Sequence, residues 1–426
     1  MEATAPVTES PRKVGAYGWY VGWVLLLVTV FSMLDRKALV MLAEPIKQDL
    51  HLSDTQLGLL TGGIFTLVYA VSSFPLARLA DRHSRARIIG WCVIAWSALT
   101  AGGSLATGFY TLAATRVGIA FGEAGASPAS HALLAQHFPP EARGRAYGIL
   151  LAGGPVGILL GLALAGWLND AFSWRVALVV LGLPGILVGL IVLTTIRDIP
   201  PKVENRESFA AAFVDAVRTI WGNPALRYVW LGLASLFVMN SASNAMLPAF
   251  VMRDMQLSAS TVGLGIGIVL GVSGFLGSLI SGWASDRLAI RSPALPLRLF
   301  AIGLFIAAPL AIGRLFTDSF PVLLVLVAGE IFLISQFAGP TFTTLQSGLR
   351  DNQRALASAV FLFGVSGIGA SFGPLLVGIV SDTAAGGGPT DGDTLRLGLL
   401  SVMPFILLAS FFFYRASVHR AAQFED

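Results

Sequence analysis

Four charged side chains lie inside stretches that are otherwise apolar enough to cross a membrane. Asp35 and Arg36 interrupt one of these stretches, and Arg116 and Glu123 interrupt another. A charge near the bilayer centre costs about 2.5–3.5 kcal/mol even on the mildest insertion scale. Two acids and two bases balance one another, as a buried charge cluster requires. Such a cluster favours a transporter, in which something charged must be handled inside the membrane.

Arg116 and Glu123 share one face of a predicted helix. They are seven residues apart, which is about 20° short of two full turns and roughly 10 Å along the axis. Asp35 lies at a depth similar to that of Arg116, so the sequence predicts an ion pair between these two side chains. Arg36 and Glu123 are available as alternative partners.

Glu123 and Asp35 are the candidate proton-coupling residues, because each carboxylate lies near arginine in a low-dielectric environment. In this hypothesis ionised Glu123 holds Arg116, and protonated Glu123 releases it to bind a phosphate or carboxylate headgroup. Arginine suits this task since its planar fork donates two parallel hydrogen bonds and stays charged. The alternatives are structural: ion pairs that lock two helices, and an Arg36 turned toward the outer aqueous vestibule.

Candidate ligands for a substrate come from both ends of the chain: Arg36, Arg116, Tyr69, Asn240, Asn244 and Glu330. Asn240 and Asn244 are one helical turn apart, so they could contact a substrate or hold two helices together. Glu330 is a further acid in an apolar stretch without an obvious basic partner, and is either a second proton site or a hydrogen-bonded or outer-cavity residue.

Composition places the chain among membrane proteins. It is 55% hydrophobic and 12% charged, with a mean hydropathy of +0.75, whereas soluble domains are about 25% charged. A span needs about 20 mostly apolar residues and must be helical, because hydrocarbon offers no partners to backbone polar groups. The sequence predicts twelve spans: 17–43, 55–80, 88–107, 109–137, 145–169, 174–196, 227–251, 259–284, 295–316, 320–347, 355–381 and 395–416.

The basic residues sort by side of the membrane. With a cytoplasmic amino terminus, both termini and the even-numbered loops hold about twenty of the 28 Lys and Arg. The opposite side holds Lys47, Arg175, Arg253, Arg314 and Arg396. This asymmetry predicts that both termini face the cytoplasm. Short loops and termini suggest a bacterial inner membrane, and one chain holds a complete bundle, so a monomer suffices.

Two related halves make up the chain. An Asp-Arg pair at 81–82 returns as Asp286-Arg287, and glycines recur every fourth residue in spans five and eleven, where small residues let helices approach closely. We expect an amino-terminal six-helix bundle over 1–196, a cytoplasmic linker over 197–226 and a carboxy-terminal bundle over 227–426. Residues 209–221 have amphipathic helical spacing and form either a membrane-surface helix or a packed connector.

The segment Leu79 to Arg87 resembles the loop signature of the major facilitator superfamily, with Ala77 and Ser84 where glycine is usual. Gly154-Pro155-Val156-Gly157 resembles its Gly-Pro signature. Within the superfamily, several segments look like the Spinster family and its bacterial members: Leu34-Asp35-Arg36, 81–85, 96–100, 116–124, 339–341, 346–347 and 354–358. The resemblance implies an all-α fold of two parallel six-helix repeats.

This resemblance also implies function: proton-linked movement of sphingosine-1-phosphate or lysophospholipid-like amphiphiles by alternating access. It implies a cytoplasmic latch between the halves, formed by Asp81, Arg82, Arg85, Asp286, Arg287, Arg143 and Arg354. The carboxy half is rich in aromatic residues at depth, so a charged wall would face an aromatic one, which suits a headgroup and a tail.

The sequence leaves other functions open as alternatives. The anion:cation symporter family, which carries sugar acids, has a similar charged motif, so a small organic anion is the alternative substrate. A non-transporting receptor or a scramblase is more remote. No nucleotide loop, metal-ligand cluster or nucleophile with a base is present, so we expect no enzyme, no nucleic-acid partner and no cofactor beyond protons as the coupling ion. Membrane lipids and the substrate are the expected partners.

Overall fold

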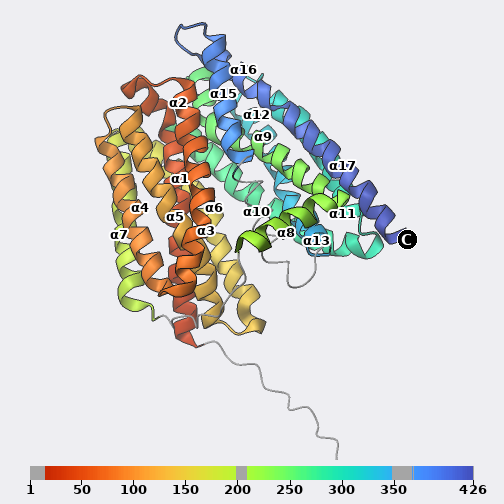
Figure 1. The fold of residues 1–426 in the computed structure, drawn as a ribbon. Helices are drawn as coiled ribbons and strands as arrows, with labels where there is room; N and C mark the ends of the chain where they lie inside the picture. Colours follow the sequence, from red (N-terminus) through yellow and green to blue (C-terminus); the bar gives the residue numbers. More distant parts are fainter. Residues whose placement is uncertain (1–14, 198–208, 348–366, 368, 426) are drawn as a thin grey trace, which may run out of the picture.

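Helices account for every regular element in the computed structural model, which describes residues 15–197, 209–347, 367 and 369–425. The predicted all-α class is therefore confirmed, and the helices form an elongated bundle (Figure 1). The proposed domain division stays a prediction, since residues 198–208 between the halves lie outside the described ranges.

The amino-terminal half forms one group of long helices. Its elements are α1 (Ala16–Leu50), α2 (Asp54–Gly58), the π-helical turn η1 (Leu59–Gly63), α3 (Ile64–Arg82), α4 (Arg85–Gly102), η2 (Gly103–Leu105), α5 (Phe109–His137), α6 (Pro140–Ala171) and α7 (Trp174–Thr195). These elements coincide with predicted spans one to six.

The carboxy-terminal half forms the second group. Its elements are α8 (Phe209–Gly222), α9 (Pro224–Asp254), α10 (Ala259–Arg291), α11 (Leu295–Gly313), α12 (Phe320–Ile334), η3 (Ser335–Phe337), α13 (Ala338–Ser347), α15 (Ala370–Ala384), α16 (Gly392–Val402) and α17 (Pro404–Glu425). Predicted span eleven, 355–381, falls within the described residues only at 367 and from 369 onward.

Nine helices of the described chain are long and apolar enough to cross a membrane, and α15 is a shorter apolar helix. The two long helices outside that set, α1 and α5, carry the four predicted cluster charges. The described helices are thus consistent with the predicted count of twelve spans.

Glycines let the helices of each half approach closely, as their spacing predicts. A Cβ atom on Gly157 of α6 would lie 2.4 Å from the Val30 carbonyl oxygen of α1. In the other half, a Cβ on Gly373 of α15 would lie 2.0 Å from the Val238 oxygen of α9. Only glycine fits at these two contacts, so the repeated small residues set how α1 meets α6 and how α9 meets α15.

The halves meet closely at the end of the bundle that carries α2, α15 and the loop 385–391, here called the α2 end (Figure 1). There α2 and η1 pack on α15: a Cβ on Gly58 would lie 2.3 Å from the Pro374 carbonyl oxygen. Nearby, a Cβ on Gly263 of α10 would lie 2.3 Å from the Leu162 oxygen of α6. Backbone contact of this kind brings the two halves together at the α2 end.

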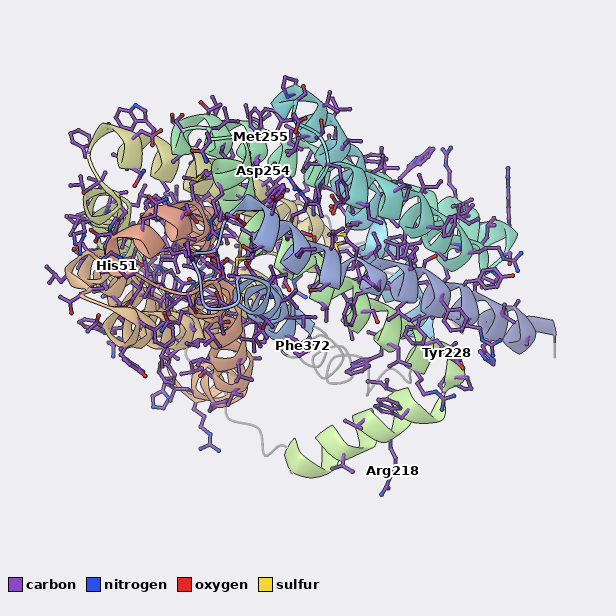
Figure 2. All side chains as sticks on the ribbon, turned by 90° about the horizontal axis from the view of Figure 1, so that it is seen from above. His51, Arg218, Tyr228, Asp254, Met255 and Phe372 are labelled. Atoms are coloured by element: carbon purple, nitrogen blue, oxygen red, sulfur yellow. The ribbon has the colours of Figure 1, made fainter. Side chains whose placement is uncertain are left out.

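The predicted amphipathic helix after the first half is present as α8. Figure 2 shows it beside the bundle, with Arg218 directed away from the other helices. Its carboxy-terminal turn packs on α9, since Ile220 is buried and the ring of Trp221 lies 5.7 Å from that of Trp230. It is a peripheral helix anchored at one end.

Candidate functional site

The centre of the site is an ion pair between α1 and α5. Arg36 Nε donates a hydrogen bond of 2.6 Å to Glu123 Oε2. The Ser32 hydroxyl donates to the same oxygen at 2.7 Å. The Glu123 side chain is 1% exposed and that of Arg36 is 27% exposed, so the arginine is the partner that reaches the cavity.

This pairing corrects two predictions. Glu123 pairs with Arg36, whereas the sequence led us to expect Arg116. The expected ion pair between Asp35 and Arg116 is also absent from the described residues. Successive helical residues point about 100° apart, so Arg36 and Asp35 face different neighbours.

Asp35 and Arg116 are nevertheless part of the same charge cluster. Both are buried, and Asp35 interacts electrostatically with Glu123 and Arg116. The guanidinium of Arg116 lies 4.7 Å from the ring centre of Phe65, and that of Arg36 lies 4.8 Å from the same ring. Phe65 therefore makes a cation–π contact with each of the two guanidinium groups, which is a favourable arrangement for a cation.

A cavity of about 200 Å³ opens onto this cluster. Arg36, Glu123 and Tyr69 line it, together with the hydroxyls of Ser32, Ser127 and Ser130 among others. The Arg36 guanidinium lies 4.7 Å from the Tyr69 ring centre. The structure thus brings Tyr69 to the charged site, next to the residues with which it was grouped.

A second and larger cavity of about 580 Å³ lies between α6, α9, α10 and α12. Asn240 and Asn244 supply part of its polar lining, and residues such as Pro155, Phe275 and Phe337 make most of the remainder apolar. Leu151 of α6 lines both cavities. A charged chamber therefore adjoins an apolar one across the two halves.

Glu330 does not line either of these cavities and is fully buried. Its carboxylate pairs with Arg314 at 3.2 Å, and Arg314 also donates to the Ser243 hydroxyl at 2.8 Å. The expectation that Glu330 lacks a basic partner is therefore wrong, and its contact with substrate stays a prediction. Arg314 follows the end of α11 and turns inward, although its position in the sequence had indicated an outer loop.

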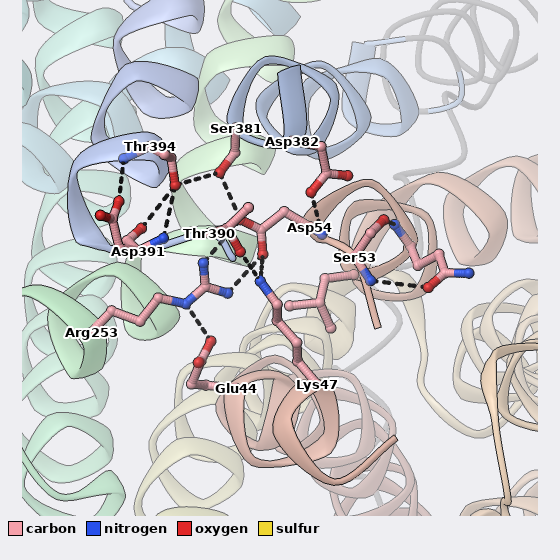
Figure 3. A network of polar contacts seen from close by, with 12 residues as sticks. Glu44, Lys47, Ser53, Asp54, Arg253, Ser381, Asp382, Thr390, Asp391 and Thr394 are labelled. Atoms are coloured by element: carbon pink, nitrogen blue, oxygen red, sulfur yellow. Dashed lines mark hydrogen bonds and ion pairs between the residues drawn. The ribbon is translucent and has the colours of Figure 1, made fainter. Parts of the chain in front are cut away.

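The α2 end holds a polar network that the sequence did not reveal (Figure 3). Asp54, fully buried, accepts hydrogen bonds from Arg253 at 2.7 and 2.9 Å, from Lys47 at 2.6 Å and from Ser381 at 2.6 Å. Arg253 also donates to Glu44 at 2.6 Å. The network joins α1 and α2 of one half to α9 and α15 of the other.

A second carboxylate completes this connection. Asp382 of α15 accepts the backbone N–H groups of Asp54 and Thr55 at 2.9 and 2.8 Å, which places negative charge at the amino terminus of α2, where the helix dipole favours it. The only sequence signal for the network was a group of charges near the predicted outer ends of spans, which we had used for orientation alone.

The predicted latch lies at the opposite end. Arg82, Asp286 and Arg287 are exposed, and Arg287 stacks on Trp283 of its own helix at 4.4 Å. Arg143 donates to the carbonyls of Phe138 and Ala135 in its own half. Arg85 is half-buried.

The remaining latch residues cannot be placed: Arg354 and the side chain of Asp81 lie outside what the structure describes. Among the residues that the structure describes, no hydrogen bond or ion pair joins Arg82, Arg85, Arg143, Asp286 or Arg287 to the other half. The latch between the halves stays a prediction. Within the described ranges, no group of three or more His, Cys, Asp or Glu could hold a metal ion.

Comparison with known proteins identifies the class. The family model described as Major Facilitator Superfamily matches residues 25–374, and the chain belongs to this family. A relative described as an MFS-type efflux pump of Mycolicibacterium smegmatis is 33% identical over 380 residues, covering 88% of this chain and 86% of the relative. The predicted fold and the multi-pass membrane character are therefore confirmed.

The Spinster resemblance is confirmed by a solved structure. The crystal structure of a bacterial homologue of the human lysosomal transporter Spinster, in an inward-facing and unoccupied conformation, superimposes with a TM-score of 0.85. It is 27% identical and covers 96% of this chain and 98% of that one. A hexuronate transporter of Bacillus subtilis is 23% identical over 419 residues, covering 93% and 95% of the two chains. These relatives are transporters, which agrees with the expectation that the chain is a transporter and not an enzyme.

Proposed function

We propose that the chain is a proton-coupled transporter of an anionic or zwitterionic amphiphile, such as sphingosine-1-phosphate or a lysophospholipid. The observation that carries this proposal is the junction of the two cavities. The smaller one exposes Arg36 beside Glu123, and the larger one is mostly apolar and lies next to it. The headgroup of such a molecule would lie in the charged cavity, and its tail would lie in the apolar cavity, so each part would be buried among groups of its own polarity.

Coupling to protons follows from the ion pair. While Glu123 is ionised, it engages Arg36 through a charge-assisted hydrogen bond of 2.6 Å, a strong class of bond. A proton on Glu123 removes that charge and leaves the guanidinium available for a phosphate or carboxylate. Asp35, buried among Glu123 and Arg116, is the second candidate for a proton-coupling role.

Alternating access would use the two ends of the bundle in turn. We propose that the α2 end faces outward and that the termini lie in the cytoplasm of a bacterial cell, because the basic residues concentrate at the opposite end. The network around Asp54 would close the outer face in this conformation. It would open when the latch residues, Asp81 among them, close the cytoplasmic face. A single chain would suffice as the working unit.

The test is movement of a fluorescent sphingoid or lysophospholipid analogue in proteoliposomes under an imposed pH gradient. Glu123→Gln should abolish the gradient-driven movement while it spares exchange of substrate across the membrane. Glu141→Gln, at the exposed start of α6, is the matched control and should behave like wild type. Gradient-driven movement that survives in Glu123→Gln would remove Glu123 from the coupling step.

A sugar acid or another small organic anion is the second candidate. The similarity to a hexuronate transporter supports it, as do the paired amides of Asn240 and Asn244 in the larger cavity. The same proteoliposomes should then exchange radiolabelled hexuronate and leave the lipid analogue in place. Uptake of the lipid without hexuronate exchange would exclude this alternative.

A further inference from the structure

Lys37 is a cation at membrane depth that the charge cluster does not neutralise. In the part of the chain that the structure describes, no carboxylate lies within 4.0 Å of its ammonium group, although ion pairs form around it. Its ammonium group contacts the Asn244 amide oxygen at 3.5 Å, a distance at the limit of hydrogen bonding. A lone charge there is costly, so its presence needs an explanation.

A count of the charges at depth leads to the same residue. The carboxylates are Asp35, Glu123 and Glu330, and the cations are Arg36, Lys37, Arg116 and Arg314. Glu123 neutralises Arg36, and Glu330 neutralises Arg314. Asp35 and Arg116 interact with one another at longer range. Among the described residues at this depth, the cations therefore outnumber the carboxylates by one, and Lys37 is a cation with no carboxylate partner.

Lys37 also points to a different place from its neighbour Arg36. One residue corresponds to a 100° turn about the helix axis, so Arg36 faces α5 while Lys37 reaches Asn244 on α9, in the other half. Its side chain starts in a tight contact with α6, where a Cβ on Gly161 would lie 2.9 Å from the Lys37 Cβ. The ammonium is thus held at the junction of the two halves.

The partner of Lys37 lines the larger cavity. Asn244 donates its amide N–H groups to the carbonyl oxygen and side-chain oxygen of Asn240, at 2.8 and 2.9 Å. This fixes the orientation of the Asn244 amide and leaves its oxygen directed toward Lys37. Both asparagines line the cavity of about 580 Å³, so Lys37 meets the cavity wall through Asn244.

From this arrangement we infer that Lys37 is a substrate ligand, the cation that receives the anionic group of the amphiphile. The inference rests on the proposed function and adds a residue and a charge requirement to it. Arg36 is available only when Glu123 is protonated, whereas Lys37 has no competing carboxylate. Lys37 therefore supplies the part of anion binding that does not depend on protonation of Glu123.

The experiment is calorimetric titration of the purified full chain in detergent with lysophosphatidate and with the uncharged monoacylglycerol of the same acyl chain. Lys37→Met should weaken binding of lysophosphatidate by about 10- to 100-fold and leave the uncharged lipid unchanged. Lys37→Arg keeps the positive charge and should therefore keep most of the wild-type affinity for lysophosphatidate. Arg291→Gln, which removes one exposed charge, is the control and should bind as wild type does.

Thermal unfolding separates this function from a structural one. Lys37→Met removes an uncompensated charge from the membrane interior, so its unfolding temperature should equal or exceed that of wild type. A lower unfolding temperature together with unchanged lysophosphatidate affinity would overturn the assignment and leave the proposed function intact.

A third titration with hexuronate identifies the source of the anionic group. If wild type binds neither lipid but binds hexuronate, and Lys37→Met weakens that binding, the lipid proposal fails while the role of Lys37 stands. If Lys37→Met binds every anion that wild type binds with equal affinity, Lys37 is not a ligand.

Discussion

Arg253 on α9 and Asp54 at the start of α2 form a two-bond ion pair that joins the two halves of the molecule. The nitrogen–oxygen distances are 2.9 and 2.7 Å, and the side chains are 7% and 0% exposed. Paired geometry of this kind is the strongest that arginine makes with a carboxylate. Because Lys47 and Ser381 donate to the same carboxylate, closure of the α2 end depends on Asp54.

Asp54→Asn should therefore shift the protein toward a conformation open at the α2 end. Breaking a buried pair costs about 3–5 kcal/mol, and 3 kcal/mol corresponds to more than a hundredfold in an equilibrium constant. Spin labels at His51 and Ala385, in a background with Cys92→Ser, would report the separation of the two halves there.

Asp393→Asn is the control for that measurement, since Asp393 lies at the same end and its side chain is 78% exposed. It should leave the distance distribution as in wild type. A distribution that does not change in Asp54→Asn would show that backbone packing alone closes this end.

The pairing of Glu123 with Arg36 predicts a specific energetic coupling. Arg36→Gln leaves Glu123 without its ion-pair partner, and Glu123→Gln leaves the arginine unpaired, so each single change should lower the unfolding temperature. The double variant removes both charges and should recover much of the loss. Thermal unfolding of the four proteins in detergent gives the coupling energy.

The same cycle with Arg116→Gln is the matched comparison. Arg116 makes no ion pair with Glu123 within the described residues, so its coupling to Glu123 should be the smaller of the two. A larger coupling for Arg116 would restore the pairing that the sequence had indicated.

Much of the fold could be predicted because hydropathy and glycine spacing act locally. Apolar length fixes the helices, and a glycine every fourth residue fixes the close contacts, as at Gly157 and Gly373. Tyr69 and Asn244, which were expected to contact substrate, each line a cavity, and their contact with substrate stays a prediction. These properties depend only on which residues form a helix and which of them share one face, and both can be read from residue spacing.

The partners of the charges could not be predicted in the same way. Whether Glu123 meets Arg36 or Arg116 depends on the rotation of α1 against α5, and neighbouring residues differ by 100°. Arg314 reaches Glu330 because the chain turns inward after α11. The network at Asp54 requires the register of one half against the other, which no local pattern encodes.

Gly157 offers a test of helix packing with its own internal control. Gly157→Ala would place a Cβ atom 2.4 Å from the Val30 carbonyl oxygen, so α1 and α6 must separate, at a cost of about 1–3 kcal/mol. Gly154→Ala meets nothing within 4 Å and should be neutral or slightly stabilising, since alanine is the better helix former. The unfolding temperatures of the two variants should differ in this order, and equal values would contradict the packing of α1 on α6.

Glu330 and Arg314 give the last prediction, which separates structure from substrate binding. Glu330→Gln leaves a buried arginine unpaired and should lower stability by about 3 kcal/mol. The double change Glu330→Leu with Arg314→Met replaces the pair by apolar side chains and should restore stability, as buried pairs often permit. Substrate affinity should stay the same in the double variant, because Glu330 lines neither the charged cavity nor the apolar one. Unaltered unfolding with a changed substrate affinity in Glu330→Gln would instead return Glu330 to the substrate site.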